Sequence, residues 1–270
     1  MLRALKSIIP SSIRRYVRER RRWRWFRGEF RTWSEAMSSS KGYADGAVLD
    51  RVVDATRQVI TGQGLWDRDG HVFREKSLHR PLLEAFQKVS ACLGAHFTVI
   101  DFGGGLGSTW RQHASQLSGL GLDLWCVVEQ PEFVRAGYEF QNETLRFFGN
   151  LTEAFSAAPY HVVMLSSVLP YLEKPYEVLA DVLKSDAEFL LLDRNPFVRD
   201  GRERLTVQHT PPFLGGGSYP CWLLSRHRVE AVITKRYELV MEWPGFDDLD
   251  PSAVQYHGTL YRKRHSSRSL

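Results

Sequence analysis

A carboxylate followed by a run of glycines is the stretch of the chain whose residue types and spacing could do chemistry. Asp101 ends an apolar run, and glycines stand at positions 103, 104, 105 and 107. Glycine permits the positive φ of a tight strand-to-helix turn and lets a ligand approach the bare backbone. A dinucleotide fingerprint needs G-x-G-x-x-G, which neither Gly103 nor Gly104 can begin. The carboxylate favours a cationic nucleoside cofactor without phosphate, with a plain glycine-rich turn as the alternative.

The spacing D-x-G-x-G-x-G, given by Asp101, Gly103, Gly105 and Gly107, resembles the first motif of class I S-adenosylmethionine-dependent methyltransferases. The resemblance implies that S-adenosyl-L-methionine is the cofactor. It also implies that the acidic residue lies by the sulfonium and amino end of the cofactor. The glycines would pass beneath its ribose and methionine part.

A second carboxylate, Glu129, follows the next apolar run, residues 124–128. In the methyltransferase fold an acidic residue at this place binds both ribose hydroxyls, and a carboxylate can accept from two neighbouring O–H donors at once. Glu129 follows Asp101 by 28 residues, whereas about 20 is usual in comparable nucleotide folds. We therefore expect a longer connection here, and a surface glutamate at a strand end is the alternative.

Three more residues complete the expected cofactor site, because ligands bind at the carboxyl ends of strands in open α/β sheets. Gln130 follows Glu129 directly. Asn150 stands where contacts to the adenine edge often arise, and Ser166 would face the methionine part.

A hydroxyl acceptor would also need a base within hydrogen-bond reach. Asp193 follows a predicted strand, and His209 titrates near neutral pH, so these two are the catalytic candidates. An ion pair of Asp193 with an arginine and an ordinary loop role for His209 are the alternatives. Four residues could contact the substrate: Arg194, Arg204, Gln208 and Tyr219.

The elements that must position these residues alternate between short apolar runs and amphipathic stretches, a pattern typical of an α/β fold. We expect a Rossmann-like class I methyltransferase sheet, mostly parallel, with an antiparallel edge formed by residues 237–243 and 258–262. Helices are predicted at residues 49–60, 81–93, 108–117 and 133–141. The segment 66–73 contains Asp67-Arg68-Asp69-Gly70, which predicts a turn in place of a calcium loop because later ligands are missing.

The predicted organisation has four parts. A basic arm spans residues 1–31, a helical cap or lid spans 32–96, and the methyltransferase core spans 97–262, followed by a polar tail at 263–270. An insertion after the fifth strand, residues 199–222, contains glycines, prolines and polar residues and is expected to be a long loop, which is usually functional or mobile.

Composition limits the classes of protein. The chain has 270 residues, of which 43% are hydrophobic, enough for one α/β domain with an extra lobe. Its three cysteines lack C-x-x-C spacing, which argues against a zinc site or a disulfide framework and for a reducing compartment. Without a long apolar run or a signal peptide, a cytoplasmic protein is expected, and no metal site is predicted.

The N-terminal arm has a charge of its own. Residues 1–31 hold 11 Lys and Arg against 2 Glu, although the whole chain carries only +5. A solvated helical arm is one interpretation. Peripheral membrane contact is another, because Trp and Phe among arginines suit an anionic lipid surface. Nucleic acid is the least favoured partner, since no recognition fold follows.

Several short segments resemble a poorly characterised bacterial family assigned as class I S-adenosylmethionine-dependent methyltransferases, whose genes often lie in surface-polysaccharide (O-antigen) clusters. These segments cover roughly residues 33–260, and one departs from the family at Pro170, where Gln is expected. The segments are Trp33-x-Glu35-Ala36, Gly42-Tyr43, Asp101 to Gly107, Val128-Glu129-Gln130, Ser166 to Glu173, Asp193-Arg194-x-Pro196, Leu205 to Gln208 and Tyr219-Pro220-x-Trp222.

The resemblance implies methyl transfer to a hydroxyl of a sugar or polysaccharide precursor. Two alternatives remain. The chain could be a non-catalytic cofactor-binding or scaffold protein recruited to the membrane, or a nicotinamide-dependent sugar enzyme, which the missing third glycine disfavours.

Overall fold

A seven-stranded sheet forms the centre of the molecule in the computed structural model, which describes residues 25–41, 46–211, 216–245 and 253–264. Its strands run in the spatial order β11-β12-β8-β7-β4-β5-β6. The strands are β4 (Phe97–Phe102), β5 (Leu122–Val128), β6 (Leu145–Phe148), β7 (Val162–Ser166), β8 (Phe189–Val198), β11 (Tyr237–Pro244) and β12 (Val254–Lys263).

The pairing confirms the predicted fold class. Strands β6, β5, β4, β7 and β8 are parallel, β12 pairs antiparallel with β8, and β11 pairs antiparallel with β12. Numbered along the chain, the order is 3-2-1-4-5-7-6, that of the Rossmann-like class I methyltransferase fold. The direction of strand order reverses between β4 and β7, and ligands bind outside the carboxyl ends of strands at such a point.

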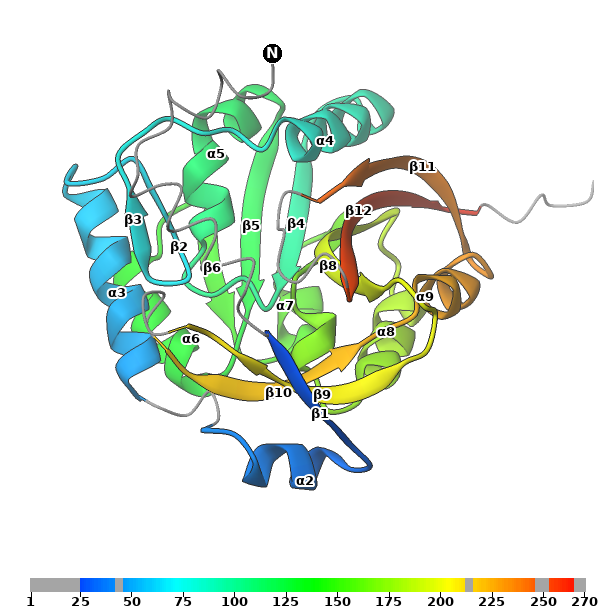
Figure 1. Ribbon diagram of the computed structural model, residues 1–270. Coiled ribbons are helices and arrows are strands. Elements are labelled where there is room, and N and C mark those ends of the chain that lie inside the picture. The colour runs from blue at the N-terminus through cyan, green and yellow to red at the C-terminus, as the bar shows by residue number, and fades with distance from the viewer. Residues whose placement is uncertain (1–24, 42–45, 212–215, 246–252, 265–270) are drawn as a thin grey trace, which may run out of the picture.

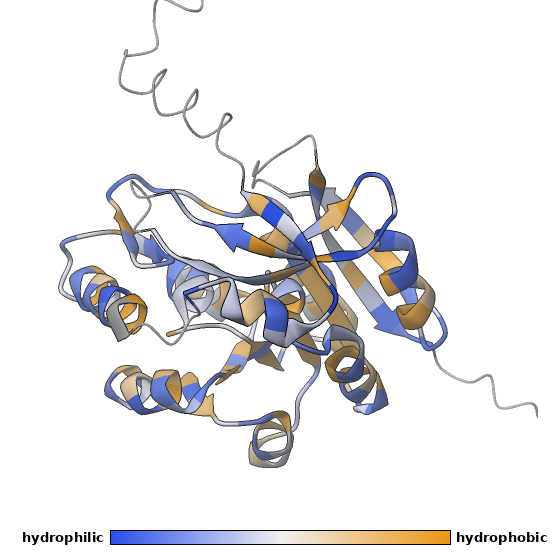
Figure 2. Ribbon diagram, turned by 60° about the horizontal axis from the view of Figure 1, so that its bottom comes forward, coloured by the Kyte–Doolittle hydropathy of each residue, from blue (hydrophilic) through white to orange (hydrophobic). Residues whose placement is uncertain are grey.

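Helices cover both faces of this sheet, and their apolar sides form two buried clusters against it. In Figure 2 the helices around the sheet carry hydrophobic and hydrophilic residues along the same ribbon, as amphipathic helices do. One face holds α4 (Arg80–Leu93), α5 (Ser108–Gly119), α6 (Pro131–Gly137) and the 3-10 helix η2 (Tyr138–Phe140). The other holds α7 (Leu151–Ala157), α8 (Pro175–Lys184) and α9 (Arg226–Ile233).

A second, three-stranded sheet lies across the carboxyl ends of the central strands (Figure 1). It has the order β1-β9-β10, with β1 (Phe26–Phe30), β9 (Arg204–His209) and β10 (Ser218–Leu223) all antiparallel. Strand β10 contacts η3 (Leu169–Tyr171), the 3-10 helix that follows β7. The short helix α2 (Trp33–Ser38) packs on the side of this sheet away from the central one.

This covering sheet changes the predicted boundaries at two places. The 199–222 insertion was expected as a loop, but much of it forms β9 and β10. Phe26–Phe30 was expected in the basic arm, but it pairs with β9 and so belongs to the folded body. The physical reason is the same at both places. A strand forms only when its backbone N–H and C=O groups pair with a neighbouring strand, and the folded chain brings that neighbour beside it.

A small lobe of α3 (Gly46–Ile60) and the hairpin β2 (Trp66–Arg68) and β3 (His71–Phe73) lies beside α5. The hairpin turn is Asp69-Gly70, both with positive φ, 51° and 76°. This two-residue turn matches the right-handed strand twist, and Asp-Gly between apolar residues is its strongest sequence signal. The turn predicted here is thus confirmed, and the strands beside it were missed.

The expected cap at residues 32–96 divides among three places. Helix α2 belongs to the covering sheet, α3 and the hairpin form the lobe, and α4 packs on the central sheet. The basic arm up to residue 24 and the tail beyond residue 264 lie outside the described residues. Within the described part of the chain, no helix is long and apolar enough to cross a membrane.

Candidate active site

The glycine turn joins β4 to α5 at the point where the strand order reverses. The Gly103 N–H donates to the Val128 carbonyl at 2.9 Å, which ties the turn to the end of β5. A Cβ at Gly103 would lie 2.4 Å from the Val168 side chain, and one at Gly104 would lie 2.4 Å from an Asp101 carboxylate oxygen. Gly105 has φ +59° and would place its Cβ in open space. The Val168 and Asp101 side chains therefore pack against the turn at Gly103 and Gly104, and a ligand can approach the backbone at Gly105.

Asp101 lies beneath this turn, on the sheet face that α4 and α5 cover. Its side chain is buried, and one carboxylate oxygen, Oδ2, accepts from the Trp125 Nε1–H at 3.1 Å. The other, Oδ1, is buried and has no hydrogen-bond partner. The pKa of Asp101 is raised to about 7, chiefly by burial and to a smaller extent by the charges of Glu129 and Asp193, while the bond from Trp125 acts against this rise. An unpaired buried carboxylate of this kind suits a cationic ligand.

Glu129 lies on the other side of the same turn, at the end of β5. Its Oε1 accepts from the Gly105 N–H at 3.1 Å, and its Oε2 accepts from the Gln130 N–H at 2.8 Å. Burial raises the pKa of Glu129, while the two backbone bonds lower it. Each oxygen keeps a lone pair for a second donor. Asp101 and Glu129, 28 residues apart in sequence, thus contact adjacent glycines of one turn.

Asp193 is fully engaged with protein donors. It is buried at the end of the parallel part of β8, where Oδ1 accepts from His79 Nε2 at 3.0 Å and from Trp243 Nε1 at 3.1 Å. Its Oδ2 accepts from the Ser166 hydroxyl at 3.3 Å. Burial alone would raise the pKa of Asp193, but the hydrogen bond from His79, the charge of Arg194 and the hydrogen bond from Trp243 outweigh burial and lower the pKa.

These contacts favour a paired, positioning carboxylate over the catalytic base expected at Asp193. The side chains that donate to it are His79, Trp243 and Ser166, whereas the alternative interpretation of the sequence was an ion pair with an arginine. His79 caps α4, with Nδ1 accepting from the Leu82 N–H at 3.4 Å, so Nε2 carries the proton given to Asp193. The His79 N–H in turn donates to His113 Nε2 at 3.0 Å.

His209 faces away from the region where an acceptor would meet the glycine turn. Side chains alternate along β9, and Leu205, Val207 and His209 share the face that packs under α2. Burial lowers the pKa of His209, and the charge of Arg27 lowers it further, so the ring is neutral at pH 7. The structure therefore corrects the prediction that His209 is a base at the site: strand alternation turns it outward.

Gln208 and Tyr219, both predicted as substrate contacts, lie together on the opposite, inner face of the covering sheet. The Tyr171 hydroxyl donates to Gln208 Oε1 at 2.9 Å, and Gln208 Nε2 donates to the Tyr219 hydroxyl at 3.4 Å. The rings of Tyr171 and Tyr219 meet edge to face, with centroids 5.4 Å apart. Thr210 also contacts the Tyr219 hydroxyl, at 3.2 Å. This cluster places an amide and hydroxyls over the end of β7.

The remaining predicted residues have other surroundings. Asn150 caps α7, with its side chain engaged twice by Glu153, so an adenine contact would compete with the cap. Gln130 is exposed, and Arg204 pairs with Asp200 at 2.9 Å on the surface. Arg194 is half-buried just after the part of β8 that pairs with β7, and it has a positive φ of 52°. A residue other than glycine in that conformation is strained by about 1–3 kcal/mol, as is common at functional sites.

His79, Trp125 and Trp243 belong to the site although the sequence did not single them out. Each supports a carboxylate, Trp125 that of Asp101 and the other two that of Asp193. Trp243 lies 50 residues and His79 114 residues from Asp193 in sequence. No local spacing connects them, so only the fold reveals these contacts.

Comparison with known proteins gives methyltransferases as the similar solved structures. The N-terminal domain of EvdMO1, crystallised in the presence of SAH and D-fucose, is 15% identical, with a TM-score of 0.47, over 83% of this chain and 98% of that chain. The N-methyltransferase NodS from Bradyrhizobium japonicum WM9, in complex with S-adenosyl-L-homocysteine (SAH), is 13% identical, with a TM-score of 0.47, over 80% of this chain and 97% of that chain.

A third solved structure is 1,6-didemethyltoxoflavin-N1-methyltransferase from Burkholderia thailandensis, at 17% identity and a TM-score of 0.43, over 82% of this chain and 90% of that chain. No protein-family model and no curated protein matches the chain. At this similarity the comparisons carry no argument about activity, so the fold assignment depends on the sheet order itself.

Proposed function

We propose that the chain is an S-adenosylmethionine-dependent methyltransferase. The observation that carries the proposal is the Asp101 carboxylate, buried beneath the glycine turn with one oxygen lacking a partner. Leaving a buried polar atom unpaired costs free energy. A cationic ligand at the turn would recover that cost, and the resemblance of the turn to the first methyltransferase motif names the ligand.

The residues around the turn fit this cofactor. Asp101 would hold its amino and sulfonium end, Gly105 would let its ribose approach the backbone, and the free lone pairs of Glu129 would accept from the ribose hydroxyls. Bound there, the cofactor supplies a methyl group on a sulfonium that an acceptor can displace. The chain contributes chiefly alignment, which can supply on the order of 7–11 kcal/mol of the barrier.

The proposed acceptor is a hydroxyl of a sugar or polysaccharide precursor. Support comes from the family resemblance and from the inner face of the covering sheet, where Tyr171, Gln208 and Tyr219 present hydroxyl and amide groups. Such groups match the donors and acceptors of a sugar. The three free cysteines support a reducing compartment such as the cytoplasm. Peripheral membrane contact through the arm remains a separate proposal.

Loss of the Glu129 carboxylate tests the cofactor site. We expect wild type to bind S-adenosylhomocysteine and Glu129→Ala to bind it roughly 10- to 100-fold more weakly, because hydrogen bonds to a charged group are worth about 1.5–3 kcal/mol. Isothermal titration calorimetry at pH 8 measures both affinities. Glu132→Ala is the matched control, since Glu132 is an exposed glutamate nearby whose partner is Arg135.

Equal affinities for wild type and Glu129→Ala would remove Glu129 from the site, and no binding by wild type at millimolar ligand would end the cofactor proposal. The non-catalytic alternative needs a different readout. Transfer of a labelled methyl group from the cofactor into components of a cell extract would exclude it, and cofactor binding without any labelled product would support it.

A further inference from the structure

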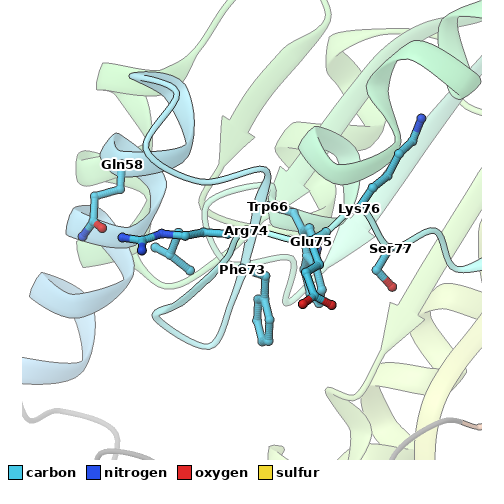
Figure 3. A pocket seen from close by; sticks show the side chains of 8 residues that line it. Gln58, Trp66, Phe73, Arg74, Glu75, Lys76 and Ser77 are labelled. Atoms are coloured by element: carbon cyan, nitrogen blue, oxygen red, sulfur yellow. Dashed lines mark hydrogen bonds between the residues drawn. The ribbon is translucent and has the colours of Figure 1, made fainter.

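A groove separate from the glycine turn lies between α3 and the segment that joins β3 to α4. It encloses about 800 Å³ and is lined by Gln58, Trp66, Val72, Phe73, Arg74, Glu75, Lys76 and Ser77. Small-molecule sites typically measure about 300–1,000 Å³ and combine an apolar wall with a few polar groups. Figure 3 shows Phe73 and Glu75 pointing into the same open space, and Arg74 extending toward Gln58.

The apolar wall of the groove is a pair of stacked rings. Trp66 and Phe73, paired across the β2–β3 hairpin, have ring centroids 3.9 Å apart and an angle of only 8° between their planes. Phe73 remains 39% exposed. Trp66 is held in place because its Nε1–H donates to the Glu75 carbonyl at 2.9 Å. A rigid aromatic face kept in contact with water suits the C–H face of a sugar ring, which is apolar while its rim is polar.

The polar groups of the groove have a definite charge. Arg74, Glu75, Lys76 and Ser77 follow one another and are all exposed. The two cations outnumber the single carboxylate, and arginine binds carboxylate and phosphate groups with paired hydrogen bonds. Gln58 and Ser77 add neutral donors and acceptors. A ligand with both sugar hydroxyls and an anionic group would use all of these side chains.

The groove is tied to the start of the helix that follows the glycine turn. Gln112 Nε2 donates to the Ser77 carbonyl at 2.9 Å, and Arg111 lies 3.8 Å from Asp67 of the hairpin. The Arg111 N–H donates to the Gly107 carbonyl at 2.9 Å, so both tethers leave from the first turns of α5. The groove therefore flanks the helix that the cofactor turn begins.

We propose that this groove binds the carbohydrate part of the methyl acceptor and that this carbohydrate carries an anionic group, a uronate or a phosphate. The inference rests on the proposed methyltransferase function. Phe73 stacks on the sugar ring, and Arg74, which extends toward Gln58, holds the anionic group. Lys76 adds positive charge to the same segment, and Gln58 and Ser77 contact hydroxyls. The groove selects the acceptor, while transfer takes place at the glycine turn.

Binding to immobilised glycans tests the proposal without the cofactor. Full-length protein is applied to a panel of acidic oligosaccharides, uronate-containing and phosphorylated, alongside neutral oligosaccharides of the same size. We expect wild type to bind acidic members, Phe73→Ala to lose at least tenfold in affinity, and the double variant Arg74→Ala/Lys76→Ala to lose as much along with most of its salt dependence. Leu65→Ala is the control, since Leu65 is exposed beside the hairpin and outside the groove lining.

Thermal unfolding shows whether each variant is folded. The double variant alters only exposed side chains, so its glycan affinity tests the proposal even if Phe73→Ala unfolds. The proposal is overturned if wild type binds no acidic member, or if the double variant binds as wild type does. It is also overturned if wild type prefers vesicles of anionic lipid, which would make the patch a membrane contact. Because cofactor is absent, failure here leaves the Glu129 calorimetry intact, and failure of that calorimetry leaves this result intact.

Discussion

Replacing Asp101 by asparagine is expected to stabilise the free protein at pH 8 while abolishing cofactor binding. The pKa of Asp101 is raised from 3.8 to about 7 in the folded chain. Ionisation above that pH therefore opposes folding, by as much as about 4 kcal/mol at about 1.4 kcal/mol per pKa unit. The new amide keeps an acceptor for Trp125 but buries an unpaired N–H₂ group, at about 1–3 kcal/mol. We expect a net gain of about 2 kcal/mol.

The stability difference between wild type and Asp101→Asn should depend on pH. A raised carboxyl pKa means that wild type loses stability as the pH rises from about 4 to about 7, whereas the asparagine variant does not. Urea unfolding of both proteins at pH 5 and at pH 8 measures the difference, which should be larger at pH 8. A difference that stays constant over this range would mean that Asp101 is not held in the protonated form near neutrality.

Cofactor binding should depend on the same ionisation in the opposite sense. The cationic cofactor requires the charged form of Asp101, so wild-type affinity is expected to fall up to tenfold for each pH unit below about 7. The asparagine variant should bind at least 100-fold more weakly at pH 8. Calorimetry with S-adenosylmethionine from pH 5.5 to 8.5 measures both, and unchanged affinity in the variant would place the amino and sulfonium end elsewhere.

Removal of the Asp193 side chain should destabilise the protein more than any other single change proposed for this site. Asp193→Ala leaves the donors of His79 and Trp243 buried without their acceptor. Each buried donor left without an acceptor costs about 1–3 kcal/mol, so the two together cost several kcal/mol. Urea unfolding at pH 7 measures the loss. Asp200→Ala is the control, because Asp200 is exposed and its surface pair with Arg204 should contribute little to stability.

The lowered pKa of Asp193 fixes how this loss depends on pH. A depressed carboxyl pKa contributes stability above the unfolded value of 3.8 and loses it as the pH falls through the folded value. The contribution of Asp193 ionisation should therefore be constant from pH 5 to 8 and disappear only in strong acid. An Asp193→Ala variant as stable as wild type at pH 7 would contradict the positioning role and return Asp193 to the list of candidate bases.

Two buried aspartates on one face of the central sheet have pKa values shifted in opposite directions. Asp101 lies on β4 and Asp193 on β8, with β7 between these two parallel strands, and the surroundings of each carboxyl set the direction of its pKa shift. Asp193 has three donors, whereas Asp101 has one and an oxygen left over. These opposed pKa shifts distinguish the two roles that we propose: Asp101 binds a cationic ligand, and Asp193 positions the side chains that donate to it.

Local patterns were sufficient for the central sheet. The helices near 49–60 and 81–93 were also predicted closely, because apolar periodicity, Pro81 at the helix start and Gly94 at its end are local signals. The glycine turn and its two carboxylates were also predicted, since Asp101 and Glu129 lie at the carboxyl ends of two buried strands. Residues that follow parallel strands meet at one edge of the sheet whatever the rest of the chain does.

What the sequence by itself determined, then, was the sheet, the glycine turn and the acidic residues at the strand ends. Only the tertiary structure decided that β1 pairs with β9, that His209 turns outward, and that Asp193 is bound by His79 and Trp243. These contacts join residues from distant parts of the chain, and a strand's exposed face depends on what packs against it. The free energy of these contacts comes from pairing between residues far apart in sequence, and the local spacing of residue types does not indicate such pairing.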